Sequence, residues 1–434
     1  MRRVLRSTAI SLATVSALLA AGCGSDSPAT AIYSPAGWPA MHADAGNSNS
    51  SPVTGSRSVS FDWSRPLGAP TATPASVAST GQIFATTGSD RGCNLWSFEM
   101  DSGRKRWCTR IGPGVAASTP IVDTATNVYI GEDGAMSSFT EMGQLRWRTV
   151  VSGTPISAQF TGDGNVLFVT QFGVVSVLSP QTGKEIVPSY QLVPAPTIEQ
   201  GQNIPLPPAA QGLDTCALGS SPECPVANTP AIDLETGRFY LTVWRPGRPA
   251  AELVAMRYRD GQLTEEWSSG VVPGGSASSP VLSADRATVY VTDTRGVLFA
   301  LDAGTGAARW QQDLGYVAAG SPSVSADGLI IPAGGPDGHL LALRDLGDRG
   351  EIAWERKELR HLGDPAQTAG GTGYTTVRDG ADGLALITFD TGTGETVDRD
   401  ALPNASGYPV GTSIGPDGEV LTSSAIGELF VFTP

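Results

Sequence analysis

A ten-residue phrase, LDAGTGAARW at residues 301–310, returns in altered form along the chain and constrains the fold more than any other feature. Related phrases are FEMDSGRKRW at 98–107, SFTEMGQLRW at 138–147 and TFDTGTGETV at 388–397. In each phrase an apolar run meets a turn rich in Gly, Asp or Thr, and a second run follows. This arrangement predicts a β-hairpin at every occurrence.

Two further β-rich runs precede the hairpin at 297–310. Residues 288–292 read TVYVT and residues 279–283 read SPVLS, and each run is followed by a short turn that contains Asp. Short runs of β-branched and aromatic residues between turns are typical of strands. Together the runs predict a four-stranded antiparallel meander whose last hairpin is the repeated phrase.

The aromatic residue that ends the phrase sets the period of the repeat. It falls at Trp63, Trp107, Trp147, Trp267, Trp310 and Trp354, and Ile186 and Val397 hold the same position where the aromatic is missing. Six of the seven intervals are 39 to 44 residues long, and the interval from Ile186 to Trp267 is 81. Four strands in roughly 40 to 50 residues is the spacing of a propeller blade. We therefore expect the tryptophans to pack between blades rather than to form a binding stack.

The two ends of the chain complement each other. Residues 59–63 (VSFDW) read as a fourth strand with no hairpin before it, and residues 428–432 (ELFVF) read as a third strand with nothing after it. The sequence therefore predicts an all-β, eight-bladed propeller of four-stranded antiparallel blades, whose last blade takes strands from both termini. Such closure leaves no long unpaired edge, so we expect a monomer.

The run Val-Tyr-Val, a turn, Leu-Phe-Ala-Leu-Asp, Thr-Gly and then Trp resembles the PQQ-like β-propeller repeat. That family includes quinoprotein alcohol dehydrogenases and the outer-membrane assembly lipoprotein BamB. Residues 38–44 also resemble the lead-in before the first blade of such chains, so the resemblance covers residues 37–434. It implies the fold and leaves the function open, because one scaffold serves dehydrogenases and assembly proteins alike.

The N-terminal residues have the pattern of an exported lipoprotein. Three arginines precede an uncharged run, and small residues lead into Cys23. Residues 1–22 are interpreted as a signal peptide that resembles a bacterial lipobox leader, which makes Cys23 the lipidation site. The alternative is an ordinary secretory signal with a free Cys23. Residues 23–36 have the composition of a flexible tether, and we expect the chain to be held at the extracytoplasmic side of a cell membrane.

The formal net charge of −14 bears on partners, and loss of residues 1–22 would take it to −17. Binding to nucleic acid needs clusters of Lys and Arg that neutralise phosphate, so no nucleic-acid partner is expected. Anionic lipid would repel the chain as well. The lipid anchor is therefore the expected membrane attachment.

Four cysteines remain when Cys23 is set aside. Cys93 and Cys108 begin and end one predicted hairpin, and Cys216 and Cys224 close a short loop. An exported chain favours a disulfide in each pair. A metal site is the alternative, but the chain has only three His to help form one.

The long interval between repeats holds a Pro-rich segment, residues 187–228, with no hairpin phrase. We interpret this segment as an insertion between blades 3 and 4. Long loops without secondary structure are often functional. The alternative is a passive surface loop closed by one disulfide.

Residues that carry chemistry are hard to find in this sequence. The resemblance to quinoprotein dehydrogenases implies a vicinal pair of cysteines and acidic ligands for calcium, but no two cysteines here are adjacent. Asp-Gly pairs at 163–164, 327–328 and 417–418 recur between the first and second predicted strands of a blade, as turns do. We therefore expect no catalytic residue, metal or cofactor. The favoured function is a non-enzymatic scaffold that docks envelope proteins. The alternative is a propeller that binds a quinone or a glycan in its central channel, including a PQQ-dependent oxidoreductase.

Overall fold

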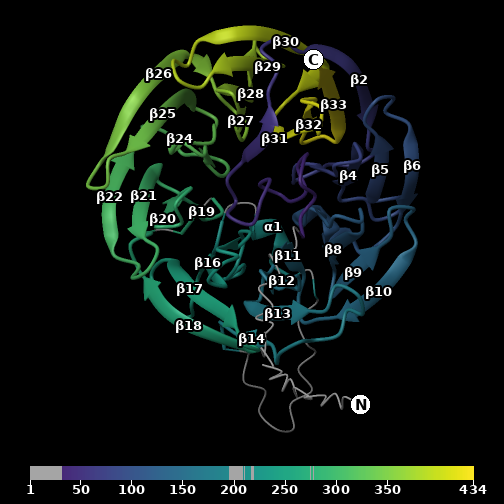
Figure 1. Cartoon of the computed structure of the whole chain (residues 1–434), viewed down its shortest axis with the longest axis vertical. Coiled ribbons are helices and arrows are strands. Elements are labelled where there is room, and N and C mark those ends of the chain that lie inside the picture. The colour runs from purple at the N-terminus through teal and green to yellow at the C-terminus, as the bar shows by residue number, and fades with distance from the viewer. Residues whose placement is uncertain (1–31, 195–208, 210, 217–218, 274, 277) are drawn as a thin grey trace, which may run out of the picture.

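The computed structural model describes residues 32–194, 209, 211–216, 219–273, 275–276 and 278–434. Within these residues the strands form eight sheets arranged as a ring around a central axis (Figure 1). Each sheet is an antiparallel blade of four strands, and one blade has a fifth, parallel strand. The predicted all-β, eight-bladed propeller is confirmed.

The blades follow one another along the chain. Blades 1 to 4 contain β3 (Ser76–Val77), β4 (Gln82–Thr86), β5 (Leu95–Glu99) and β6 (Lys105–Thr109); β7 (Ile121–Val122), β8 (Val128–Glu132), β9 (Ala135–Phe139) and β10 (Leu145–Val150); β11 (Pro155–Phe160), β12 (Val166–Thr170), β13 (Val174–Leu178) and β14 (Tyr190–Gln191); β15 (Ala231–Ile232), β16 (Arg238–Val243), β17 (Glu252–Arg259) and β18 (Gln262–Ser269). Blades 5 to 8 contain β19 (Val281–Leu282), β20 (Thr288–Thr292), β21 (Val297–Asp302) and β22 (Ala308–Asp313); β23 (Ser323–Val324), β24 (Leu329–Ile331), β25 (His339–Asp345) and β26 (Gly350–Arg360); β27 (Ala366–Ala369), β28 (Thr372–Asp379), β29 (Gly383–Asp390) and β30 (Thr396–Ser406), with β1 (Ser50–Thr54) added; β31 (Pro409–Ile414), β32 (Val420–Ser424), β33 (Glu428–Thr433) and β2 (Ser60–Pro66). Two short helices, η1 (Pro113–Ala117) and α1 (Leu213–Cys216), lie between strands.

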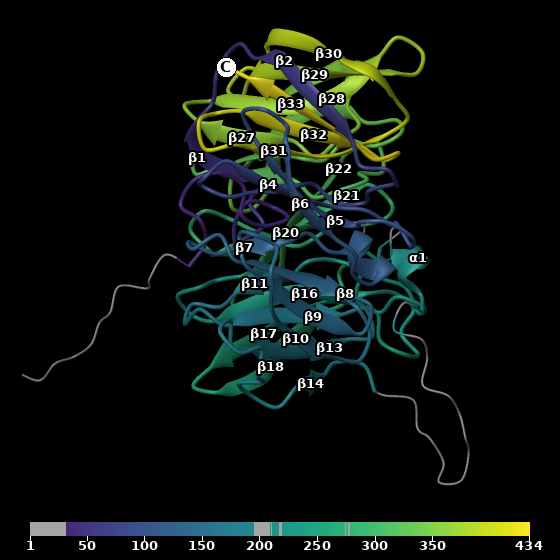
Figure 2. The ribbon, with the colours of Figure 1, turned by 90° about the vertical axis from the view of Figure 1, so that its right-hand side faces the viewer.

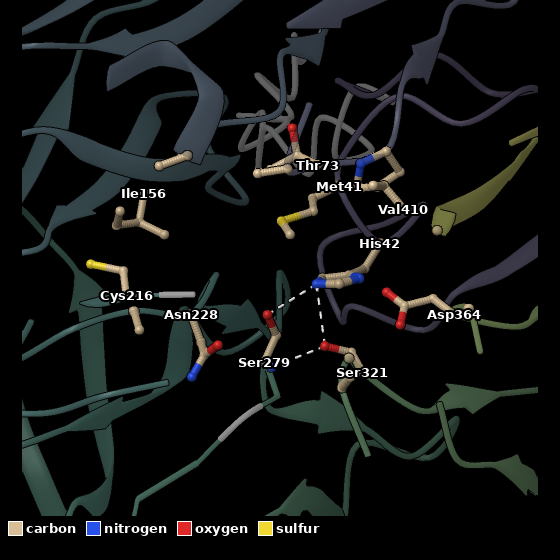
Figure 3. Close-up of a pocket in the computed structure, with 18 of the residues that line it drawn as sticks. Met41, His42, Thr73, Ile156, Cys216, Asn228, Ser279, Ser321, Asp364 and Val410 are labelled. Carbon is tan, nitrogen blue, oxygen red and sulfur yellow. Dashed lines mark hydrogen bonds between the residues drawn. The ribbon is translucent and has the colours of Figure 1, made fainter. Parts of the chain in front are cut away.

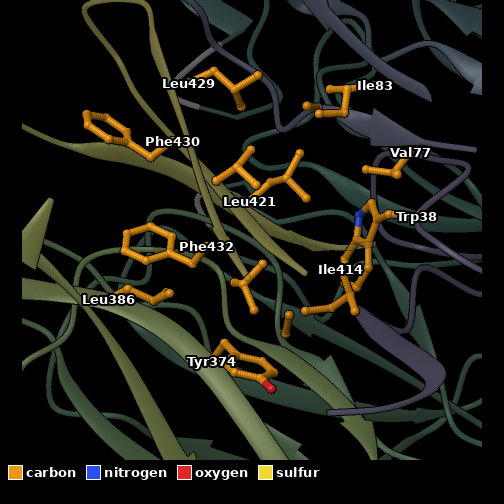
Figure 4. Packing of buried hydrophobic residues seen from close by; sticks show 14 of the residues in the cluster. Trp38, Val77, Ile83, Tyr374, Leu386, Ile414, Leu421, Leu429, Phe430 and Phe432 are labelled. Atoms are coloured by element: carbon orange, nitrogen blue, oxygen red, sulfur yellow. The ribbon is translucent and has the colours of Figure 1, made fainter. Parts of the chain in front are cut away.

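Blade 8 closes the ring with strands from both ends of the chain, as predicted. β2 pairs antiparallel with β33, and Trp63 lies opposite Val431. The apolar side chains of this blade pack against those of blades 1 and 7, with Phe430 and Phe432 fully buried (Figure 4). The core of the closing blade thus joins residues from the two termini.

The predicted tryptophan positions lie between blades. Six indole rings each pack on the glycine in the turn between the third and fourth strands of the next blade, so close that an added Cβ would lie 2.5–2.8 Å from a ring carbon. The pairs are Trp63 on Gly103, Trp107 on Gly143, Trp147 on Gly183, Trp267 on Gly306, Trp310 on Gly350 and Trp354 on Gly394. Only glycine allows this approach, and five of the six glycines also have a positive φ that favours it.

At the two positions without an aromatic residue, no side chain packs on a glycine turn of the next blade. Val397 precedes blade 8, where the third and fourth strands belong to opposite ends of the chain. Ile186 precedes blade 4, whose corresponding glycine, Gly261, has nothing within 4 Å of an added Cβ. Ile186 keeps the strand pairing through its N–H to the carbonyl of Val177, but its side chain is 44% exposed.

A segment before the first complete blade lies at the axis of the ring, and we call residues 38–49 the hub segment (Figure 1). Its backbone pairs with the first strands of blades 1, 2, 4, 5, 6 and 7 in turn. The hydrogen bonds join Trp38 with Val77, Pro39 with Val122, Ala45 with Ile232, Gly46 with Leu282, Ser48 with Val324 and Asn49 with Gln367. β1 then continues the contact with blade 7 as a parallel partner of β27.

The described part of the predicted tether, residues 32–36, is bound to the ring. Tyr33 bridges to Asp123 in the turn between β7 and β8, and its hydroxyl contacts Gln159 of β11. The tether therefore ends earlier than composition suggested. The contacts lie on the face that carries the turns between first and second strands, which we call the N-terminal face.

Residues within the predicted insertion lie on the opposite face, which we call the α1 face (Figure 2). The side chain of Gln171, in the turn between β12 and β13, donates to the carbonyls of Ala209 and Gln211. Two parts of the 187–228 segment belong to the blades themselves, because β14 is the fourth strand of blade 3 and Val226 is buried in the core. The part outside the blades is thus shorter than predicted.

Both predicted disulfides are present. Cys93 is bonded to Cys108 across the hairpin of blade 1, with 5.7 Å between the Cα atoms. Cys216, at the end of α1, is bonded to Cys224, with 5.3 Å between the Cα atoms. The second bond fixes α1 to the chain that leads into blade 4.

Candidate functional site

A cavity of about 510 Å³ lies on the axis of the ring and is lined by residues from all eight blades (Figure 3). Met41 and His42 of the hub segment lie on one side of it, and α1 contributes Leu213, Asp214 and Cys216 to its wall. The cavity belongs to the α1 face, because its other walls are the loops that lead into the first strand of each blade. A cavity of this size suits a small organic ligand.

These loops share a sequence feature, a proline that follows a polar residue at the start of each blade. Six blades place Ser or Thr before the proline, and blades 7 and 8 depart from this rule. The residues before proline are Thr73, Thr119, Thr154, Thr229, Ser279, Ser321, Asp364 and Tyr408. Asp364 is thus the one acidic member of a ring of eight equivalent positions.

The Asp364 carboxylate lies at the cavity with no basic partner within the described residues. It packs on the backbone of Gly320, where an added Cβ would lie 1.7 Å from Oδ1. The side chain is partly exposed to the cavity but lies deep in the molecule, so loss of hydration raises its pKa to about 7, opposed by the backbone N–H of Ser321. Among the residues that the structure describes, no Lys or Arg lines the cavity.

His42 is held at the cavity by polar groups from the hub and from two blades. Its Nε2 lies 2.9 Å from Ser279 Oγ and 3.4 Å from Ser321 Oγ, and its Nδ1 lies 3.1 Å from Asn49 Oδ1. Asn49 Nδ2 donates to the carbonyls of Ser321 and Pro322, so Oδ1 accepts the proton carried by His42 Nδ1. Ser279 then donates to Nε2, and burial lowers the pKa of His42 to about 4.

The chain Ser279, His42, Asn49 has the order of a nucleophile, a base and an orienting group. It differs from an activated serine in its orienting group, which is a neutral amide and not a carboxylate. A base must take a proton near the working pH, and a neutral amide gives the protonated imidazole no charge to stabilise it. With Ser279 and His42 both at least 97% buried, the arrangement fixes the hub segment to blades 5 and 6.

The site residues predicted from the sequence do not lie together in the structure. Cys23 and residues 204–208 of the Pro-rich segment lie outside the described residues. Cys93 and Cys108 lie in blade 1, away from the axis, whereas Cys216 lines the cavity. His42 and Asp364 were missed, although an alignment of the eight pre-proline positions would have identified Asp364 as the one acidic residue.

Replacing Asp364 with Ser, the residue that blades 5 and 6 use, tests its environment. Because the folded-state pKa of about 7 exceeds the ordinary value near 3.9, ionisation weakens the native state as pH rises from about 4 to 7. The difference in unfolding free energy, Asp364→Ser minus wild type, should therefore be more favourable at pH 8 than at pH 4, by roughly 1–3 kcal/mol. This range allows for partial hydration of the carboxylate by water in the cavity. Urea unfolding at both pH values measures the difference, and an equal effect at both would contradict a raised pKa.

The described residues contain no group of three or more His, Cys, Asp or Glu placed to hold a metal ion. Among them there is also no helix with the length and apolar character needed to cross a membrane.

Comparison with known proteins gives a consistent picture. The family described as outer membrane protein assembly factor BamB matches residues 49–247 and 249–410. Protein Rv3035 of Mycobacterium tuberculosis is 37% identical over 418 residues, which cover 95% of this chain and 100% of the relative. The outer membrane protein assembly factor BamB of Yersinia pestis is 22% identical over 81% of this chain and 82% of its own.

A solved structure with the same fold is the quinohemoprotein alcohol dehydrogenase of Comamonas testosteroni. It is 14% identical, has a TM-score of 0.67, and the match covers 93% of this chain and 81% of the dehydrogenase. At this identity the likeness concerns the propeller alone.

Proposed function

The chain belongs to the family of the outer membrane protein assembly factor BamB, and from that premise we propose that it is an extracytoplasmic scaffold, tethered to a membrane, that docks other envelope proteins and catalyses no reaction. One observation carries the proposal. The chain enters the ring on the N-terminal face, while α1 and the described residues Ala209 and Gln211 lie on the opposite face. A tether on one side thus leaves the other side free for partners.

The α1 face presents apolar side chains near the mouth of the cavity. Tyr408 is 51% exposed and Ile426 is 62% exposed, and the two are neighbours because the N–H of Ala425 donates to the carbonyl of Tyr408. Exposed aromatic and aliphatic groups on a rigid support are typical anchors for a protein partner. They define the surface to test.

The docking test compares matched double variants on the two faces. Tyr408→Ser with Ile426→Ser should abolish recovery of the partners that co-purify with the tagged wild-type chain from its own membranes. The control is Met142→Ser with Leu346→Ser, which removes side chains of similar exposure (59% and 45%) from turns on the N-terminal face. Equal recovery with both variants would contradict docking on the α1 face, and melting curves verify that both remain folded.

In this proposal residues 1–22 are a signal peptide that is removed, and a lipid on Cys23 attaches the tether to the membrane. A thioether-linked diacyl group carries two acyl chains, and each buried methylene adds about 0.8 kcal/mol of membrane affinity. The group therefore anchors the protein without a second attachment signal. Cys23→Ser should release the protein from the membrane fraction. Mass spectrometry of the wild-type N-terminus identifies the modification, and an unmodified cysteine there would defeat this part of the proposal.

The fold also occurs in quinoprotein dehydrogenases, so the axial cavity must be tested for PQQ. PQQ carries three carboxylates, which need cationic partners when they are buried. The cavity instead contributes Asp214 and Asp364, with no Lys or Arg and with a neutral His42. These residues do not fit PQQ, and we expect no thermal shift with PQQ and calcium. Labelling of Ser279 by a fluorophosphonate would argue against a non-enzymatic role.

A further inference from the structure

The axial cavity contains the Asp364 carboxylate, which has no basic partner within the described residues. Asp364 is the one acidic residue in a ring where six of eight positions are Ser or Thr, so the repeat alone does not account for it. An acid kept at a deep position without a basic partner weakens the fold, as argued above. Its retention points to a ligand that supplies the missing positive charge.

The cavity wall shows what else this ligand must carry. Met41, Ile156 and Val410 present apolar groups, which suit a short alkyl chain (Figure 3). Asn228 gives its amide hydrogens to Thr242 Oγ1 at 3.1 Å and to the carbonyl of Ser276 at 3.2 Å, so its oxygen is the group left for a ligand. The cavity therefore offers acceptors and apolar surface.

We propose that the axial cavity binds an alkylammonium group, with Asp364 as its counter-ion. An ammonium has three N–H donors and no acceptor, which matches the acceptor-only carboxylate of Asp364. Asp214 on α1 adds a second negative charge at the wall. Binding an amine is independent of docking on the α1 face, so the two proposals fail separately.

Isothermal titration of the full chain with n-butylammonium chloride tests the site. We expect saturable binding, and no binding of butanol or butyrate, which share the alkyl chain but lack the cation. Asp364→Ser should lower the affinity by roughly 30-fold or more, since it removes the charge partner of a buried cation. The matched control is Asp260→Asn, at a turn residue whose side chain is 93% exposed, and it should bind as the wild type does.

Binding should also depend on pH through Asp364. The ligand pairs with the carboxylate, so below the pKa of about 7 it must displace a proton, and affinity should fall about tenfold between pH 8 and pH 6. The other titratable groups that face the cavity are His42, which burial keeps neutral in this range, and Asp214. Asp214→Asn should keep the pH dependence, and Asp364→Ser should lose it.

The same titration with Nα-acetyl-lysine N-methylamide distinguishes two sources of the ammonium. Tighter binding of this compound than of butylammonium would indicate a lysine side chain of a docked protein, and the reverse order would indicate a free amine. Absence of saturable binding of both compounds, or equal affinity of wild type and folded Asp364→Ser, would overturn the proposal.

Discussion

A chain that starts at residue 68 is expected to lose cooperative folding, whereas a chain that starts at residue 32 should unfold like the full-length protein. The shorter chain lacks β2, the hub segment and β1. It therefore loses the strand that pairs with β33, the buried Trp38 and Trp63, and the backbone bonds along the first strands of six blades. Losses on this scale exceed the roughly 5–15 kcal/mol that stabilise a typical domain.

Thermal melts followed by circular dichroism, together with size-exclusion chromatography, measure the outcome. An exposed β33 edge should also drive aggregation. A third chain separates the two losses: residues 56–67 placed after Pro434 through a short turn would restore β2 beside β33 but not the hub segment. We expect it to regain solubility but to melt well below the chain that starts at residue 32. A cooperative melt of the shortest chain within a few degrees of the longest would refute the shared blade.

Trp310→Ala should destabilise the protein by roughly 3–5 kcal/mol, the usual cost of truncating a buried aromatic residue. Trp310 is 6% exposed and packs on Gly350 of the next blade. Its Nε1 donates to Asp345 Oδ1 at 2.7 Å, and Asp345 also accepts from the Tyr290 hydroxyl. The substitution thus opens a cavity between two blades and removes one of the three donors to the Asp345 carboxylate, the third being the backbone N–H of Gly347.

Two comparisons make the Trp310 result specific. Trp310→Phe keeps most of the apolar contact but loses the hydrogen bond to a charged group, so it should cost roughly 1.5–3 kcal/mol. Tyr408→Ala, at a half-exposed aromatic position, should change the free energy of unfolding by less than about 0.5 kcal/mol. Urea denaturation with an unchanged slope is the measurement. A loss for Trp310→Ala no larger than that for Tyr408→Ala would remove its assigned role between blades.

The parts of the fold that the sequence predicted are those with a period. Strands of blade 5 match their predicted runs because alternating apolar residues and turn chemistry are local signals, and 43- or 44-residue spacing carries them from blade to blade. The disulfides were predictable because each pair is near in sequence. Residues 59–63 near the N-terminus and 428–432 at the C-terminus predicted the closure of blade 8, because each run lacked the strands that the other supplied.

The hub segment escaped prediction because nothing repeats in it. Residues such as Gly46 and Asn49 act through backbone atoms that bond to strands hundreds of residues away, and backbone atoms leave no mark in a composition. Asp364 escaped for a related reason, since its significance comes from seven other positions that are distant in sequence. The same holds for the bound end of the tether at Tyr33, which a count of small and polar residues describes as free.

The pairing of β2 with β33 also dictates an order of assembly. β2 is among the first strands to be synthesised and β33 is the last. The backbone groups of β2 that pair with β33 therefore lack their partner until nearly every residue has been made. The hub segment must already lie on the axis when the ring closes, because a closed ring surrounds it. The eight blades therefore assemble around the N-terminal hub segment. A chaperone that covers β2 until β33 has been synthesised would act at the step where misassembly is easiest.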